Sequence, residues 1–207
     1  MSAVTADTVR NAYSERAAEY IEFIGRIEHA AQRDRDYLLA WARATPGALI
    51  DAGCGPGQWT AFLHDAGVDI EGVDPVAAFI EDARNRYPTA RYRVARAERL
   101  GVARASLGGV LAWFSLIHID PASIDNSLLE FARCIRPGGS LAVGYFDGTA
   151  GESFDHAVVS AFYWSADALT ARLERAGFTV TDVQTRQDPD VRRQGVIVAT
   201  RDETSTV

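Results

Sequence analysis

The sequence predicts an α/β fold in which a doubly wound, mostly parallel sheet carries helices on both faces. Short apolar segments alternate with longer segments of helical periodicity between residues 48 and 176, and this alternation is typical of parallel sheets. Two further strand-like segments, near 178–186 and 193–200, follow with only Gln187-Asp188-Pro189-Asp190 as a connection. Because no helix separates them, we expect these two strands to pair as an antiparallel hairpin.

Each element is predicted from its local pattern. Two helices are expected over 5–22 and 28–44, where apolar residues such as Val9 and Ala12 fall on one face. Ser165 suits an N-cap and Gly177 a helix end, so the last helix lies between them. The remaining elements are strands near 48–51, 70–73, 91–94, 108–113 and 140–145 and helices near 57–66, 76–86 and 124–135. With the hairpin, the sheet has seven strands.

Length and composition suit one domain. The 207 residues, of which 47% are hydrophobic, can bury one α/β core. We predict a single domain over 1–207, with an N-terminal helical cap (1–45), a core (46–201) and a polar tail (202–207). Because the sequence lacks both a run of about eighteen apolar residues and a signal-peptide pattern, a cytoplasmic location and no membrane are expected. Cys54 and Cys134 have no His or Cys at metal spacing, which predicts reduced thiols and no metal.

The charge balance bears on partners. A formal net charge of −7 argues against a surface that neutralises many phosphates, so nucleic acid is not expected as a partner. Six arginines cluster between residues 84 and 99, alternating with apolar and small residues. This pattern favours the solvated side of a helix and strand over a phosphate-binding stripe. The oligomeric state stays open between monomer and homodimer.

The segment Leu49–Gly57 indicates a ligand site. Gly53, Gly55 and Gly57 follow the first strand, where glycines permit positive φ angles and let a ligand approach the backbone. A second strand ends at Asp74, 17 residues beyond Gly57, where a carboxylate can accept both hydroxyls of a ribose. Asp74 also precedes Pro75 and could begin a helix. The glycine loop and Asp74 together predict an adenosine-type cofactor.

The glycine spacing separates two classes of cofactor. Dinucleotide oxidoreductases carry Gly-x-Gly-x-x-Gly, in which the last glycine comes three residues after the second. In this chain the interval between Gly55 and Gly57 is two residues. An NAD-dependent oxidoreductase is therefore retained only as an alternative.

Further motifs follow in a fixed order along the chain. They are Asp51 before Gly53-x-Gly55-x-Gly57, Ala97-Glu98 after the third strand, the segment Gly109–His118, the turn Arg136-Pro137-Gly138-Gly139, and Tyr163-Trp164-Ser165 with Ala176-Gly177-Phe178. In this order the chain resembles, over nearly its whole length, the class I S-adenosylmethionine-dependent methyltransferases and their small-molecule, type 11-like branch. The resemblance implies a Rossmann-like sheet closed by the C-terminal hairpin. It also implies S-adenosyl-L-methionine as cofactor and S-adenosyl-L-homocysteine as product.

The resemblance implies a set of cofactor-binding residues. Asp51 would face the cofactor's amino group or hydrogen-bond the glycine loop, and Glu98 would contact adenine or stay a solvated charge. Trp59 would lie over the cofactor or pack in its helix. Tyr13 and Tyr20 resemble an N-terminal lid over the methionine end, or simply pack their helix. The expected set is Tyr13, Tyr20, Asp51, Gly53, Gly55, Gly57, Trp59, Asp74, Pro75, Ala97, Glu98 and Trp113.

The acceptor is expected beside the fourth strand. His118 lies just past this strand, where the acceptor meets the donor in this fold, and histidine can take a proton near neutral pH. It is therefore the candidate catalytic base, with a structural histidine bonded to a carbonyl as the rival interpretation. In this family the connection 147–164 lies above the acceptor pocket. The expected substrate residues are His118, Phe146, His156, Tyr163 and Trp164.

The implied reaction is methyl transfer to a small molecule at oxygen, nitrogen or carbon. Such transfer is an in-line displacement, so the protein aligns the reactants and needs no covalent residue. Phe114-Ser115-Leu116-Ile117 stands where nucleobase and amide N-methylating members carry Asn or Asp followed by Pro-Pro-aromatic, which favours a small-molecule acceptor. A regulatory module that holds the cofactor without catalysis is the second alternative.

Overall fold

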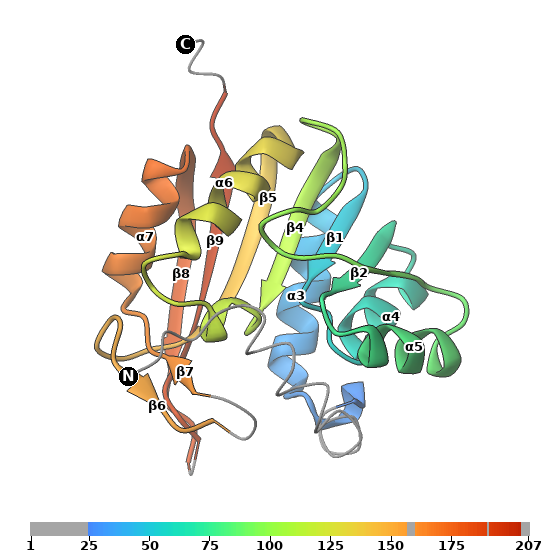
Figure 1. Cartoon of the computed structure of the whole chain (residues 1–207), viewed down its shortest axis with the longest axis horizontal. Coiled ribbons are helices and arrows are strands. Elements are labelled where there is room, and N and C mark those ends of the chain that lie inside the picture. Colours follow the sequence, from blue (N-terminus) through green and yellow to red (C-terminus); the bar gives the residue numbers. More distant parts are fainter. Residues whose placement is uncertain (1–24, 157–159, 190, 204–207) are drawn as a thin grey trace.

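The computed structural model describes residues 25–156, 160–189 and 191–203. A seven-stranded sheet in the order β3-β2-β1-β4-β5-β9-β8 forms its centre (Figure 1). The predicted helix 5–22, and with it Tyr13 and Tyr20, lies outside the described residues. The seven predicted strands are all present, and the Rossmann-like, doubly wound arrangement is confirmed.

Five parallel strands set the position of the site. They are β1 (Leu49–Ala52), β2 (Ile70–Asp74), β3 (Arg91–Val94), β4 (Leu107–Trp113) and β5 (Ile135–Phe146). The chain runs outward from β1 through β2 to β3 and then returns to place β4 on the other side of β1. In open α/β sheets, ligands bind at the carboxyl ends of the strands where the order reverses. That point lies between β1 and β4.

The C-terminal hairpin closes the sheet. β8 (Phe178–Arg186) pairs antiparallel with β9 (Gln194–Arg201), and β9 pairs antiparallel with β5. The predicted hairpin is thus confirmed. Because β8 runs in the same direction as β5, its last residue, Arg186, reaches the edge of the sheet at which the parallel strands end.

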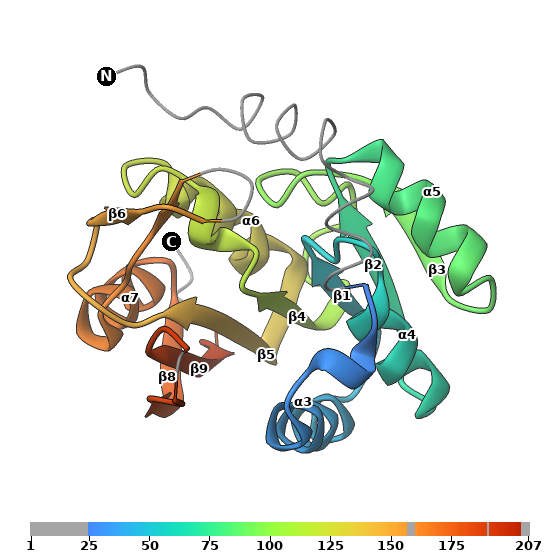
Figure 2. The same ribbon diagram turned by 90° about the horizontal axis from the view of Figure 1, so that it is seen from below.

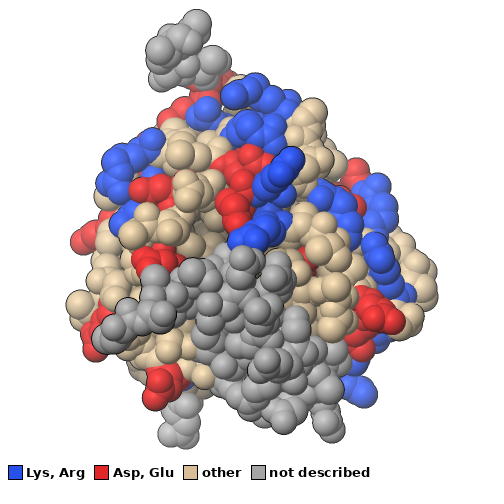
Figure 3. All heavy atoms as spheres, in the orientation of Figure 1, with Lys and Arg blue, Asp and Glu red and all other residues tan. Residues whose placement is uncertain are grey.

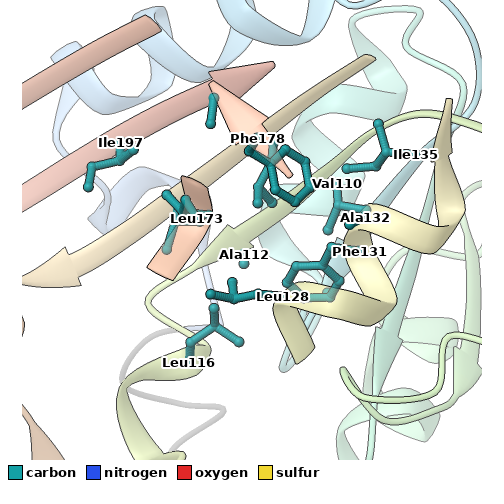
Figure 4. Close-up of a cluster of buried hydrophobic side chains, with 14 of the residues drawn as sticks. Val110, Ala112, Leu116, Leu128, Phe131, Ala132, Ile135, Leu173, Phe178 and Ile197 are labelled. Atoms are coloured by element: carbon teal, nitrogen blue, oxygen red, sulfur yellow. The ribbon is translucent and has the colours of Figure 1, made fainter. Parts of the chain in front are cut away.

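Helices cover both faces of the sheet. α3 (Gln32–Ala44) and α4 (Gln58–Asp65) share one apolar cluster with Leu111, whereas α6 (Ile124–Cys134) and α7 (Ala166–Arg175) share another with Val110. Neighbouring residues of β4 thus point to opposite faces, as the period of a strand requires. Figure 2 shows α3 and α6 on opposite sides of β4. Figure 4 shows the second cluster, in which Phe131 of α6 lies near Phe178 and Val110.

The remaining helix packs on the outer strands. α5 (Ala77–Arg86) buries Ile80 and Ala83 against Tyr92 of β3. The β2–β3 ladder pairs Asp74 with Val94, so the tip of β2 lies beside the loop that carries Ala97 and Glu98.

Three boundaries differ from the sequence prediction. The helix expected over 28–44 is divided into a 3-10 turn, Ile27–His29, and α3, because Ala30 and Ala31 are extended. β5 begins at Ile135 rather than near 140, because Ile135 already pairs with Leu107 of β4. The connection expected over 147–164 contains a short pair of strands, β6 (Ser153–Phe154) and β7 (Ala161–Phe162).

The arginine cluster takes part in local pairs. Arg91 and Arg93 bond Asp69 and Glu71 across the β2–β3 ladder, and Arg84 donates to the Tyr92 carbonyl oxygen. On the face shown in Figure 3, basic and acidic side chains stand close together. These pairs agree with the predicted solvated surface. Over the described ranges, no helix combines the length and the apolar character that a membrane span requires.

Candidate functional site

A cavity of about 860 Å³ lies at the carboxyl ends of β1, β2 and β4. Loops after these strands, the N-terminal part of α3 and the end of the β8–β9 hairpin contribute to its wall. Most of the expected cofactor residues and the expected catalytic histidine meet there, namely Asp51, Gly53, Gly55, Trp59, Asp74, Pro75, Ala97, Glu98, Trp113 and His118. The topological switch point therefore coincides with the predicted site.

The backbone angles and the packing of the loop show why it contains three glycines. Gly53, Gly55 and Gly57 all have positive φ, at 78°, 54° and 85°. A Cβ on Gly53 would lie 2.3 Å from Ser115 Cβ, and one on Gly57 would lie 2.7 Å from the Tyr92 ring, so both glycines are required by packing. A Cβ on Gly55 would meet nothing within 4 Å. Gly55 therefore faces open space inside the cavity, where its backbone is available to a ligand.

Asp74 joins the tip of β2 to the glycine loop. Its Oδ2 accepts a hydrogen bond of 3.0 Å from the Gly55 amide, and its Oδ1 accepts one of 2.8 Å from the Val76 amide. Burial raises the pKa of Asp74 to about 6, although these two bonds oppose the rise. A carboxylate has acceptor sites beyond these two. Both readings of Asp74, ligand acceptor and organiser of the following turn, are compatible with this geometry.

Asp51 is buried below the loop. Its Oδ2 accepts a hydrogen bond of 2.7 Å from Thr60 Oγ1, so Asp51 contacts α4 rather than the glycine backbone. Burial raises the pKa of Asp51 to about 7, and the nearby charge of Asp74 adds to the rise. The site thus holds two carboxylates in a poorly solvated region, where a cation would be favourable.

Aromatic rings form one wall of the cavity. Trp59 is 7% exposed, and its ring centroid lies 5.8 Å from that of Trp113. Trp113 meets Phe114 at 5.0 Å, and Phe114 meets Phe146 at the same distance. Phe114 has φ of 52°, a conformation that costs energy for a residue with a Cβ. Trp59 therefore both packs in the core and lines the cavity.

His118 lies at the cavity and is largely desolvated. Its Nδ1 is 3.1 Å from the Ser160 carbonyl oxygen, and because a carbonyl only accepts, Nδ1 carries the proton. Burial lowers the pKa of His118 to about 4. The imidazole is therefore neutral at pH 7, with its lone pair on Nε2. His118 thus has both the carbonyl contact expected of a structural histidine and the cavity position expected of a catalytic one.

The other expected substrate residues lie outside the lining of the cavity. The rings of His156 and His118 are 5.0 Å apart, and Tyr163 packs on Phe154 at 4.3 Å. Trp164 is 3% exposed. Among the described residues that line the cavity, Phe146, His156, Tyr163 and Trp164 do not occur. Two of the four contact residues that do line it, because His156 packs on His118 and Phe146 packs on Phe114.

Comparison with known proteins shows what this chain is similar to. Residues 49–139 match the family model of a methyltransferase domain. A malonyl-[acyl-carrier protein] O-methyltransferase from Pseudescherichia vulneris is 29% identical over 143 residues, which cover 69% of this chain and 55% of that protein. A demethylmenaquinone methyltransferase from Beutenbergia cavernae is 33% identical over 114 residues, covering 51% and 47%. The chain spans about half the length of these curated relatives.

The fold comparison agrees. A 1,6-didemethyltoxoflavin-N1-methyltransferase from Burkholderia thailandensis, crystallised with 1,6-didemethyltoxoflavin and S-adenosylhomocysteine, matches with a TM-score of 0.80 and 21% identity, over 98% of this chain and 92% of that one. Residues 49–139 are thus similar to a methyltransferase domain, and the fold is that of class I methyltransferases. S-adenosylmethionine is the cofactor of this family.

Several residues that line the cavity were not predicted from the sequence. Arg186 of β8 makes a bidentate ion pair with Asp34 of α3, with N···O distances of 2.5 and 2.6 Å, and both residues line the cavity. The two are 152 residues apart, so no local pattern could reveal the pair. Asp188 and Gln194 extend this polar group through bonds to Arg186.

Gln58 and Ser115 were also missed. Both line the cavity, and Gln58 Oε1 and Ser115 Oγ are buried without a hydrogen-bond partner among the described residues. Gln58 directly follows Gly57, so its place beside the glycine loop was the one available signal. Buried polar atoms without partners are rare in native proteins and point to an absent ligand or water. With the open space at Gly55, they show that the cavity fits a polar ligand such as the family's cofactor.

Proposed function

We propose that this protein catalyses methyl transfer from S-adenosylmethionine to a small-molecule acceptor. The observation that carries the proposal is the meeting of Gly55, Asp74 and His118 at one cavity. These residues lie at or just beyond the ends of three different strands, and each supplies a group that methyl transfer needs. The volume of about 860 Å³ falls within the range of small-molecule sites. We further propose that residues 46–201 act as one domain with 1–45 as its cap.

The cofactor would occupy the β2 side of the cavity. Asp74 would accept the ribose hydroxyls, and the loop of Ala97 and Glu98 would contact adenine. The backbone of the glycine loop, with Gly55 facing the open space, would lie against the centre of the cofactor. The bound cofactor supplies an electrophilic methyl group on a sulfonium. All other contributions come from the chain.

The aromatic wall would serve the reacting end. Positive charge on the sulfonium is lost during transfer, so a weakly polar wall that excludes water suits the site. Trp113 and Phe114, which line the cavity at the end of β4, provide such a wall. Aromatic faces also attract cations. Tyr13 and Tyr20 stay proposed lid residues that would complete this enclosure.

His118 would orient the acceptor and take its proton. The Nδ1–H bond to Ser160 fixes the ring, so that Nε2 presents a lone pair. A pKa near 4 makes this histidine a weaker base than usual, which favours acceptors whose hydroxyl or amine proton is already acidic. His156 and Phe146 would hold His118 and Phe114 in place, and Tyr163 and Trp164 would support the segment above them.

A label-transfer assay tests the proposal. The protein is incubated with S-adenosylmethionine labelled in its methyl group and a library of small metabolites, and products are analysed by mass spectrometry. We expect one compound class to gain the label while S-adenosylhomocysteine accumulates in equal amount. Binding of S-adenosylhomocysteine with no label transferred to any compound would instead favour a regulatory module. Tight binding of NAD with none of S-adenosylhomocysteine would favour an oxidoreductase.

A further inference from the structure

Gln58 carries a buried hydrogen-bond acceptor in the cavity wall that no described residue bonds. It is the first residue of α4, is 9% exposed and lines the cavity. Within residues 25–156, 160–189 and 191–203, no group bonds its Oε1 atom, which is shielded from solvent. An amide oxygen in this position costs free energy unless a donor meets it. The expected partner is therefore a donor on the ligand that fills the cavity.

The position of Gln58 along the cavity narrows the choice of donor. Asp74 and the loop of Ala97 and Glu98 mark one end, at the tips of β2 and β3. Gln58 begins α4 directly after the glycine loop of β1, and β1 stands between β2 and β4 in the sheet, so Gln58 lies on the far side of β2 from the tip of β3. The residue thus stands on the side of the cavity away from the proposed adenosine subsite.

The chemistry of the cofactor leaves one donor for this end. S-adenosylhomocysteine can donate from the adenine amino group, the ribose hydroxyls and the α-ammonium of its amino-acid part. The proposed function assigns adenine to the loop with Ala97 and the ribose to Asp74. The remaining donor is the α-ammonium, whose three N–H groups can meet Gln58 as well as Asp51, the residue that the resemblance sets near this amino group. An amide oxygen is a suitable acceptor for an ammonium.

We propose that Gln58 Oε1 receives the α-ammonium of the cofactor and so selects a nucleoside that carries an amino-acid group. Gln58 is then a specificity-determining residue of the cofactor site. The proposal rests on the proposed function, because it needs an adenosyl cofactor in this cavity. It adds a residue that distinguishes S-adenosylhomocysteine from a truncated nucleoside of otherwise identical structure.

A comparison of two ligands tests the assignment by titration calorimetry. S-adenosylhomocysteine carries the amino-acid group, and 5′-methylthioadenosine lacks it. In Gln58→Leu we expect the affinity for S-adenosylhomocysteine to fall about tenfold or more, the effect of one charge-assisted hydrogen bond. The affinity for 5′-methylthioadenosine should stay within about twofold of wild type, because that ligand has no group to bond Gln58.

Two further variants control the experiment. Gln58→Glu keeps an acceptor oxygen, so it should bind S-adenosylhomocysteine at least as well as wild type. Gln184→Leu changes a glutamine that bonds Asp182 outside the cavity, and should leave both affinities unchanged. Equal loss of both ligands in Gln58→Leu, or loss of neither, would overturn the assignment. If wild type bound neither ligand, the proposed function itself would fall.

Discussion

The Asp74 carboxylate accepts a 3.0 Å hydrogen bond from the Gly55 amide and so joins the end of β2 to the glycine loop after β1. This bond brings the proposed ribose acceptor and the most open part of the loop together. Burial makes the ionised form of Asp74 costly in free energy, and the pKa of the carboxyl group is raised for that reason. A residue kept ionisable in such a place is expected to serve ligand binding more than stability.

Replacement of Asp74 should therefore weaken cofactor binding. In Asp74→Ala we expect the loss of about 1.5 to 3 kcal/mol of binding free energy for S-adenosylhomocysteine, the scale of charge-assisted hydrogen bonds. Titration calorimetry measures this directly. Asp69→Asn is the matched control, since Asp69 directly precedes β2, the strand that ends at Asp74, but pairs with Arg91 at the surface. Wild-type affinity in Asp74→Ala would remove Asp74 from the ribose site.

The loop glycines should divide into two classes. Gly57→Ala should destabilise the fold, because its Cβ would enter the Tyr92 ring and the Ala83 methyl group. Gly55→Ala has space for its Cβ and should cost only about 1 to 2 kcal/mol of backbone strain, yet it would weaken cofactor binding by filling the cavity. Urea unfolding and calorimetry separate the two effects. Equal affinities in Gly55→Ala and wild type would mean that the ligand lies elsewhere.

Removal of the Asp51 charge should stabilise the ligand-free protein. The folded pKa of about 7 lies above the usual 3.8, so the folded state binds more protons between these values and wild-type stability falls as pH rises. Asp51→Asn keeps an acceptor for Thr60 without the buried charge. We expect a higher melting temperature for the variant at pH 8, and a difference that shrinks as pH falls toward 4. A variant less stable than wild type at pH 8 would contradict this account.

The ion pair of Asp34 and Arg186 should hold α3 to the hairpin. Asp34→Ala leaves a partly buried guanidinium short of partners, and we expect the free energy of unfolding to fall by about 1.5 to 3 kcal/mol. Tyr37→Phe is the control, because Tyr37 also joins α3 to β8, through a 2.7 Å bond to Asp182, but does not line the cavity. It should cost about 1 kcal/mol and leave cofactor affinity unchanged. A free energy of unfolding in Asp34→Ala equal to that of wild type would contradict this account.

His118 is tested once an acceptor is known. His118→Ala should lower kcat about a hundredfold, with little change in the affinity for S-adenosylhomocysteine. Because burial lowers the pKa of His118 to about 4, the histidine is neutral from pH 6 to 8, and kcat should show no histidine step there. A step near pH 6.5 would contradict the lowered pKa of His118. An unchanged kcat in the variant would leave only the structural role through Ser160.

Features with local sequence signals were predictable, and features that depend on distant contacts were not. The hairpin, the glycine loop and Asp74 each follow from a short pattern, because strand alternation and turn chemistry act over a few residues. The pairing of Asp34 with Arg186 depends on the end of β8 meeting α3, which the local pattern does not contain. Tyr163 and Trp164 stand away from the cavity because β6 and β7 turn the connection back on itself, so that the Trp164 amide bonds the Phe146 carbonyl.

The most direct test is titration of the wild-type protein with S-adenosylhomocysteine and, separately, with NAD. The geometry of Gly55, Asp74 and Gln58 predicts saturable binding of S-adenosylhomocysteine at one site per chain and no measurable binding of NAD. Tight binding of NAD with no binding of S-adenosylhomocysteine would contradict the account at its centre.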